Sequence, residues 1–200
     1  MVSAAALLFF FVVLVSVRSE GVWFAFDQIV STFVPYVQYA PFTFLAVVLA
    51  FVFDTQAMVA YSLLIALFCW WRGRNVATTF FAVVMLLNAA LLLLVKNIVG
   101  RERPVLQVMH ETGFSFPSGH SMSALVFFGL LLYLLWGSAM SARKRLVLSG
   151  IAVILVLFVG ASRIYLNVHW LSDVIAGFLL GISLLGASIL VLRRITGKVF

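Results

Sequence analysis

Charged residues and cysteine are both scarce in this sequence. Only 10% of its 200 residues are Asp, Glu, Lys or Arg, while 65% are hydrophobic. A soluble domain of this length cannot bury so much apolar surface in one core, so the composition indicates a membrane protein. The single cysteine, Cys69, excludes a disulfide framework and a thiolate metal cluster, and we interpret it as a packing residue within a membrane helix.

Apolar runs close to the roughly 20 residues that span a bilayer recur along the chain. Four of them predict transmembrane helices directly, at 76–95, 122–138, 146–162 and 174–192. A fifth run at 4–17 resembles the core of a signal peptide, but no positive charge precedes it and no clear cleavage site follows it. We therefore expect it to remain as a membrane helix.

The apolar stretch 41–71 is too long for one span and is interrupted by three consecutive polar residues. At about 1.5 Å per residue it would overshoot a hydrocarbon core about 30 Å thick. We predict a span at 57–71 and a half-inserted or interfacial helix at 42–53, with Pro35 and Pro41 breaking the chain before it.

The predicted fold is therefore all-α, a polytopic membrane protein with six transmembrane helices. Residues 1–54 would form the first helix and the interfacial segment, and residues 55–200 the core of the helical bundle. The longest polar connection is roughly 100–121. Any chemistry must lie there and at the neighbouring helix ends.

The formal net charge of +7 would suggest a nucleic-acid partner in a soluble protein, but here the charges follow the predicted spans. Basic residues cluster after the second, fourth and sixth spans: Arg72 and Arg74, then Arg143, Lys144 and Arg145, then Arg193, Arg194 and Lys198. The positive-inside rule makes these ends and both termini cytoplasmic, in a multi-pass protein of the plasma membrane. We expect no nucleic-acid partner, and the sequence gives no sign of the oligomeric state.

The opposite, extracytoplasmic ends of the spans carry every acidic residue and all three histidines. The acidic residues are Glu20, Asp27, Asp54, Glu102, Glu111 and Asp173. The same side holds Arg18 and four cations that break the positive-inside rule, Lys96, Arg101, Arg103 and Arg163. Charges at membrane depth cost about 2.5 to 3.5 kcal/mol each on insertion scales, so this group predicts a site for an anionic ligand.

Lys96 and Arg103 are seven residues apart and would share one helix face if the helix reached Arg103. Gly100 and Pro104 argue against that, because proline disfavours helical geometry in the residue before it. We expect Arg103 to sit where the helix unwinds, with its guanidinium free to bind phosphate oxygens. The alternative is a pair of cations that reach the membrane interface from a helix end.

Pro117, Ser118, Gly119 and His120 directly precede the fourth span. Ser118 is a natural N-cap, and the free N–H groups and positive dipole at a helix start favour an anion. Gly119 would let that anion approach the backbone closely, and His120 in the first turn would point at it. A cap and turn without chemistry is the alternative.

His169 and Asp173 are four residues apart, which would place them on one helix face within hydrogen-bonding reach. A carboxylate that accepts from Nδ1–H fixes the imidazole tautomer, leaves Nε2 free to attack phosphorus and stabilises the cation that forms. The same spacing also suits a helix cap or a metal ligand pair.

Together, the three segments resemble the signatures of the type 2 phosphatidic acid phosphatase superfamily, PAP2. The matching strings are Lys96-x6-Arg103-Pro104, Pro117-Ser118-Gly119-His120 and Ser162-Arg163-x5-His169-x3-Asp173, all without a substitution, and the resemblance covers roughly 55–192. It implies a six-helix core and a metal-independent phosphatase without a cofactor. Cations of the protein would then supply the positive charge that Mg²⁺ supplies in many phosphoryl-transfer enzymes.

By position, the resemblance makes His169 the nucleophile that becomes phosphohistidine, Asp173 the group that orients it, and His120 the general acid for the leaving group. The phosphate-binding residues would be Lys96, Arg103, Ser118, Gly119 and Arg163. The substrate would be a membrane lipid, with undecaprenyl diphosphate favoured and phosphatidylglycerol phosphate or phosphatidate next. The alternatives are phosphotransfer to an alcohol instead of water, and a non-catalytic membrane protein that binds lipid head groups.

Other polar residues nearby fall outside these signatures. We interpret Arg101 and Glu102 as partners of each other or of the lipid surface. His110 and Glu111 are expected in solvent, with a lid or leaving-group role as the alternative. Asn88, inside the third span, is expected to hydrogen-bond to a neighbouring helix.

Overall fold

Residues 1–197, which the computed structural model describes, form eight α-helices and no β-strand. The helices are α1 (Val2–Arg18), α2 (Val22–Val37), α3 (Ala40–Val52), α4 (Thr55–Trp71), α5 (Asn75–Val99), α6 (Gly119–Trp136), α7 (Ala142–Tyr165) and α8 (Leu171–Thr196). The predicted all-α class is confirmed.

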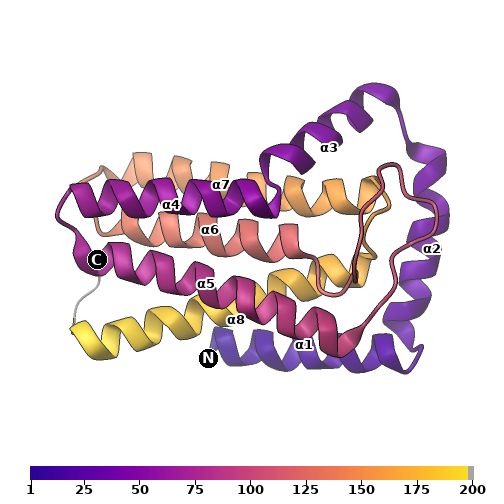
Figure 1. Ribbon diagram of the computed structural model, residues 1–200, viewed down its shortest axis with the longest axis horizontal. Helices are drawn as coiled ribbons and strands as arrows, with labels where there is room; N and C mark the ends of the chain where they lie inside the picture. Colours follow the sequence, from indigo (N-terminus) through magenta and orange to yellow (C-terminus); the bar gives the residue numbers. More distant parts are fainter. Residues whose placement is uncertain (198–200) are drawn as a thin grey trace.

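Helix α6 lies inside the bundle. It packs against α4, α5, α7 and α8, while α1 lies along α8 and α3 contacts α7. Figure 1 shows α4 to α8 running along the long axis of the molecule. Apolar side chains that α6 directs inward, such as Val126 and Leu130, are almost fully buried. The helix that carries the Pro-Ser-Gly-His motif at its start is therefore held from several sides.

Four of the predicted spans are confirmed as single long helices. They correspond to α5, α6, α7 and α8, each long and apolar enough to cross a membrane. The spans predicted at 4–17 and 57–71 coincide with α1 and α4, which have 17 residues each. Each belongs to a bent helix pair, so the described chain offers between four and six spans.

The sequence interpretation missed α2 as a helix. Pro35 lies within its last turn, so the break that proline imposes falls close to the natural helix end at Val37. Pro41 occupies the second position of α3, where its missing N–H has no helical partner to lose. Helix α1 bends by 73° into α2, and α3 bends by 50° into α4. As a result α2 crosses one end of the bundle and α3 leaves it at an angle (Figure 1).

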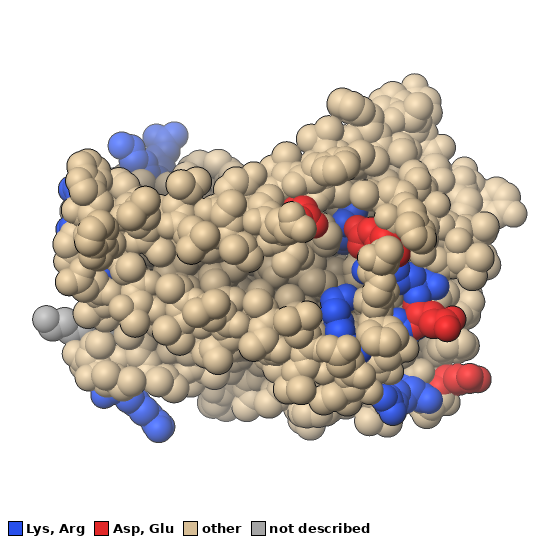
Figure 2. All heavy atoms as spheres, in the orientation of Figure 1, with Lys and Arg blue, Asp and Glu red and all other residues tan. Residues whose placement is uncertain are grey.

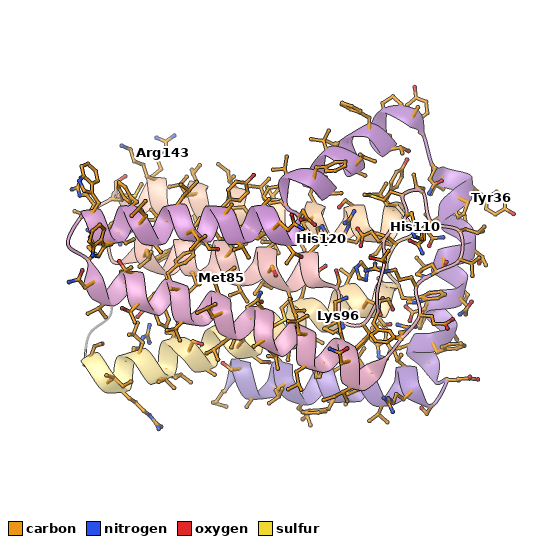
Figure 3. All side chains as sticks on the ribbon, viewed as in Figure 1. Tyr36, Met85, Lys96, His110, His120 and Arg143 are labelled. Atoms are coloured by element: carbon orange, nitrogen blue, oxygen red, sulfur yellow. The ribbon has the colours of Figure 1, made fainter. Side chains whose placement is uncertain are left out.

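Charged residues gather toward the two ends of the face in Figure 2. The basic residues after α4, after α6 and at the end of α8 lie at one end, where Figure 3 labels Arg143. Lys198, predicted to belong to this group, lies outside the described residues. Between the ends, exposed side chains such as Leu63, Leu86 and Phe158 cover the helices. Apolar cover of this extent suits contact with lipid.

Candidate active site

The three sequence motifs meet at the end of the bundle opposite Arg143. Figure 3 shows Lys96 on α5, His120 at the start of α6 and His110 on the long loop at this end. A cavity of about 730 Å³ opens here, lined from the α3–α4 junction, the loop before α6 and the ends of α5, α6 and α7. Its polar lining includes Lys96, Arg103, His120, Arg163 and His169. The tertiary structure thus joins groups up to 73 residues apart in the sequence.

The start of α6 has the predicted N-cap. The Ser118 hydroxyl accepts from the Ser121 N–H at 3.4 Å, and the Ser118 N–H donates to the Asp173 carbonyl at 2.9 Å. This second bond ties the start of α6 to the start of α8. A Cβ on Gly119 would meet no protein atom closer than 3.9 Å, so packing does not require glycine there. Gly119 instead lines the cavity, where a bound anion could approach its backbone.

Arg103 lies beyond the end of α5, as the sequence analysis expected. The helix ends at Val99, and Gly100 reverses the chain in the left-handed region with φ 62°. The Arg103 guanidinium then reaches back to donate to the Val168 carbonyl at 2.8 Å, and its Nη1 lies 3.2 Å from His169 Nε2. Lys96, still on α5, donates to the Phe114 carbonyl. Both cations therefore border the same cavity from different segments.

His169 and Asp173 are brought together, but not on one helix face as the spacing predicted. Helix α8 begins only at Leu171, so His169 precedes it and Asp173 lies in its first turn. One Asp173 oxygen, Oδ2, accepts from the Trp170 N–H at 3.0 Å and lies 3.4 Å from His169 Nδ1. Asp173 therefore caps the start of α8 and also faces the imidazole of His169. The helix cap and the contact with His169, which are alternatives from the sequence alone, occur together.

The neighbours of His169 fix its tautomer. Arginine can only donate hydrogen bonds, so Nε2 beside Arg103 Nη1 must carry the lone pair, which leaves the proton on Nδ1 facing Asp173. Burial lowers the pKa of His169 well below its usual value, and the positive charges of Arg103, Lys96 and Arg163 add to the effect. The imidazole is then neutral, and its Nε2 lone pair accepts from Arg103, which lines the cavity together with His169.

Arg163 connects the second histidine to the cavity. This fully buried arginine, at 0% exposure, places Nη1 3.0 Å from His120 Nε2 and 2.8 Å from Glu111 Oε1. By the same argument from donors, His120 Nε2 carries a lone pair while it accepts from Arg163. Asp54, the N-cap of α4, lies 3.7 Å from that nitrogen.

Glu111 is a site residue that sequence reasoning did not assign to the site. Its carboxylate bridges Arg103 at 2.9 Å and Arg163 at 2.8 Å, and its side chain is only 17% exposed. The expectation that Glu111 lies in solvent is therefore wrong, while His110 beside it is exposed. Guanidinium groups that hold a carboxylate in this way can also bind phosphate oxygens.

Arg101 is not paired with Glu102, contrary to the sequence interpretation. It donates to Asp173 Oδ1 and to Asp27, both at 2.7 Å. The Arg101 guanidinium also lies over the Trp170 ring at 5.1 Å, a cation–π contact. The signal that could have revealed Asp27 is its position as a lone acid in an apolar stretch, because a charge there needs a partner.

Two further findings concern residues 1–197. The expected contact of Asn88 with a neighbouring helix is confirmed, since Asn88 on α5 donates to the Ser123 hydroxyl on α6 at 2.9 Å. Within these residues no group of three or more His, Cys, Asp or Glu side chains is arranged to hold a metal ion.

The fold and these motifs agree with comparisons to known proteins. The family model of the PAP2 superfamily matches residues 77–196, more than half of the chain. The chain therefore belongs to the PAP2 superfamily, as the three motifs predicted. Among solved structures, the first transmembrane PAP2 type phosphatidylglycerolphosphate phosphatase from Bacillus subtilis has the same fold, with a TM-score of 0.89 and 97% coverage of both chains. Its sequence identity is 23%.

Curated relatives share shorter stretches of sequence. Phosphatidylglycerophosphatase B of Bacillus subtilis (strain 168) is 41% identical over 92 residues, which is 44% of this chain and 45% of that protein. Phosphatidylglycerophosphatase B of Escherichia coli (strain K12) is 32% identical over 109 residues, 52% of this chain and 41% of that protein. The matches thus span less than half the length of these relatives.

Proposed function

We propose that this membrane protein is a lipid phosphatase that hydrolyses a phosphate monoester or diphosphate through a phosphohistidine intermediate on His169. The observation that carries the proposal is the position of His169 Nε2. His169 lines a cavity together with Lys96, Arg103 and Arg163, and its Nε2 lies beside Arg103, while Nδ1 faces the buried carboxylate of Asp173. A neutral nucleophile among fixed cations suits attack on an anionic phosphoryl group.

In the first half of the proposed reaction, Nε2 of His169 forms a bond to phosphorus while the bond to the leaving oxygen breaks. Asp173 stabilises the imidazolium, and the cations with the N–H group of Gly119 hold the phosphoryl oxygens, while Ser118 caps the helix that presents Gly119. In the empty site burial lowers the pKa of His120 to about 4, so His120 would gain its proton only when the negative charge of the bound phosphate raises that pKa, and it would then give the proton to the leaving oxygen. In the second half, neutral His120 takes a proton from water, the water oxygen attacks phosphorus, and the bond to Nε2 breaks.

Phosphatidylglycerol phosphate is the first substrate to test. The names of both curated relatives and of the solved structure support it. The cavity also suits a lipid, since its lining includes Ala50 and Phe51 of α3 and Ala57 of α4 beside the charged groups. Undecaprenyl diphosphate, which the sequence analysis favoured, and phosphatidate complete the panel.

The proposed orientation puts the cavity on the extracytoplasmic side and the described basic clusters in the cytoplasm. The grouping of Arg72, Arg143 and Arg193 with their basic neighbours at the end away from the cavity supports it. Accessibility of single cysteines, introduced at Gly73 or Glu20 in the Cys69→Ala protein, tests it. A membrane-impermeant thiol reagent applied to intact cells should label position 20 alone. Labelling of position 73 alone would reverse the orientation.

The activity test is phosphate release from the lipid panel by the purified full-length protein in detergent with EDTA. Wild type should release phosphate, and His169→Ala should not. Arg103→Ala should lose activity, whereas Arg143→Ala, which removes an exposed arginine at the other end, should keep it. Trapping with a ³²P-labelled substrate should give an acid-labile, alkali-stable phosphoprotein in wild type.

The alternatives give different results in the same experiment. An alcohol-dependent phosphotransferase would form a new phosphoester from added glycerol in place of free phosphate. A head-group-binding protein would bind lipid phosphate without turnover, and His169→Ala would behave as wild type. Equal activity of wild type and His169→Ala would refute the proposed nucleophile.

A further inference from the structure

Asp27 on α2 is a buried acid that the proposed mechanism leaves unused. It is 0% exposed and is the one acidic residue in its helix. It also lies outside the region of the family match, residues 77–196. Its Oδ1 accepts from the Ser172 N–H at 2.8 Å, and its Oδ2 accepts from the Ser172 hydroxyl and from Arg101 Nη2. Asp27 thus caps the start of α8 from another helix.

Arg101 carries this contact onward to the nucleophile. While Nη2 donates to Asp27, Nη1 donates to Asp173 Oδ1 at 2.7 Å and to the Ser172 hydroxyl at 2.8 Å. The second oxygen of Asp173 faces His169 Nδ1 at 3.4 Å. An unbroken chain of polar contacts therefore runs from Asp27 through Arg101 and Asp173 to His169, in the order carboxylate, guanidinium, carboxylate, imidazole.

The charges in this chain have a direct consequence. Arg101 paired with Asp173 alone would cancel the negative charge that has to stabilise the His169 imidazolium. With Asp27 as a second partner, the three side chains Asp27, Arg101 and Asp173 carry a formal charge of −1. These side chains are buried, and charges interact more strongly away from water. The change from a neutral pair to a group of charge −1 therefore acts strongly on His169.

Two further contacts fasten α2 and Gln38, the residue that follows it, to the segment that carries His169. The Ser31 hydroxyl donates to Asn167 Oδ1 at 2.9 Å, and the Gln38 amide donates to the Tyr165 carbonyl at 3.0 Å. Figure 1 shows α2 lying across the end of the bundle beside this segment. Helix α2 therefore holds the connection between α7 and α8 from outside, with Asp27 as its charged contact.

We propose that Asp27 is a positioning residue for the phosphoryl-transfer step: by sharing Arg101 with Asp173, it keeps Asp173 oriented behind His169 and leaves the group of Asp27, Arg101 and Asp173 with a net negative charge. The inference rests on the proposed function. It gives Asp27 a part in setting the rate of the chemical step, although Asp27 does not line the cavity.

The test compares Asp27→Asn with wild type in phosphate release from phosphatidylglycerol phosphate in detergent, with kcat and KM determined separately. We expect kcat to fall about 10- to 100-fold, by analogy with the loss seen when the hydrogen-bond partner of a metal-binding histidine is removed. KM should stay within about twofold, because the cations that bind phosphate are unchanged. A kcat within about twofold of wild type would overturn the inference.

Two controls separate this role from the mere attachment of α2. Glu20→Gln removes an exposed acid just before α2, and Ser31→Ala removes a contact of α2 without changing charge. Both should keep kcat within about twofold. A loss of kcat in Ser31→Ala equal to that in Asp27→Asn would assign the effect to attachment of α2 and overturn the positioning role.

A double-mutant cycle tests the route through Arg101. If Asp27 acts through Arg101, Asp27→Asn should change kcat by less than about twofold in an Arg101→Met background, whereas independent effects would multiply. If the losses of kcat from the two substitutions multiply, Asp27 does not act through Arg101. Should Asp27→Asn fail to fold, Arg101→Lys replaces it: a lysine point charge cannot fork onto two carboxylates, so kcat should fall at least about 10-fold with KM unchanged. Wild-type kcat in Arg101→Lys would overturn the inference.

These results are distinct from a failure of the proposed function. If wild type releases no phosphate from any lipid of the panel, the proposed function fails. If wild type is active, His169→Ala is inactive and Asp27→Asn equals wild type, the proposed function stands and the positioning role of Asp27 is refuted.

Discussion

Gly177 on α8 sets how closely α8 approaches the start of α6. A Cβ placed there would lie 2.7 Å from the Ser118 carbonyl oxygen and 3.2 Å from the Ser121 Cβ. The first contact involves backbone, which cannot rotate away, so Gly177→Ala must push the two helices apart. Overpacking of this kind costs about 1 to 3 kcal/mol. The move would displace Ser118 to His120 together, and small misplacements of catalytic groups can cost about 100-fold in rate.

Gly150→Ala on α7 is the matched control, because a Cβ there would have no atom within 4 Å. Thermal unfolding in detergent and kcat for phosphate release should both be measured. Gly177→Ala should unfold several degrees lower and lose at least about 10-fold in kcat, while Gly150→Ala should unfold no lower than wild type because alanine favours the helix. Equal stability and kcat for Gly177→Ala and wild type would refute the close contact between α8 and the start of α6.

Three further predictions concern the cavity and its support. Glu111→Gln removes the carboxylate that bridges two arginines where phosphate should bind, so KM should fall about 2- to 10-fold with little change in kcat; a rise in KM would mean that Glu111 helps to hold the substrate. His169, whose pKa is lowered by burial, should remain neutral below pH 6.5 in the empty enzyme; NMR of ¹⁵N-histidine-labelled protein, with the signal assigned by its loss in His169→Ala, tests this, and half-protonation at pH 6.5 or above would contradict it. Asn88→Leu should lower thermal stability by roughly 0.6 to 2 kcal/mol without changing KM; unchanged stability would show that its bond to α6 contributes nothing.

Much of the fold was accessible from hydropathy and charge. The apolar segments that predicted α5 to α8 are long and uninterrupted. Each therefore indicates a transmembrane helix without any knowledge of tertiary contacts. Helix α2 was not predicted, because polar residues and Pro35 interrupt its apolar pattern. Tertiary contacts such as that between Asp27 and Ser172 hold it against the bundle. The division of the chain at residues 54 and 55 stays a prediction.

The parts of the candidate site that could be predicted are those whose residues lie close together in the sequence. Ser118 was found because an N-cap and the helix it starts are adjacent, and the pairing of His169 with Asp173 because the two are close in sequence. The reason given for that pairing was wrong, since α8 begins after His169. The role of Arg101 was missed because Asp27 and Asp173 lie 74 and 72 residues away. The bridge through Glu111 was missed because one of its two arginines, Arg163, lies 52 residues away.

The sequence by itself determined that the chain is a helical membrane protein of the PAP2 superfamily, with cations and histidines grouped at predicted helix ends. Those properties follow from local hydrophobicity, charge and motif spacing. Only the tertiary structure decided that Arg101 is shared by Asp27 and Asp173, that Glu111 lies between Arg103 and Arg163, and that α2 holds the segment bearing His169. A buried charge takes the partner that packing brings to it, and sequence distance does not reveal that choice.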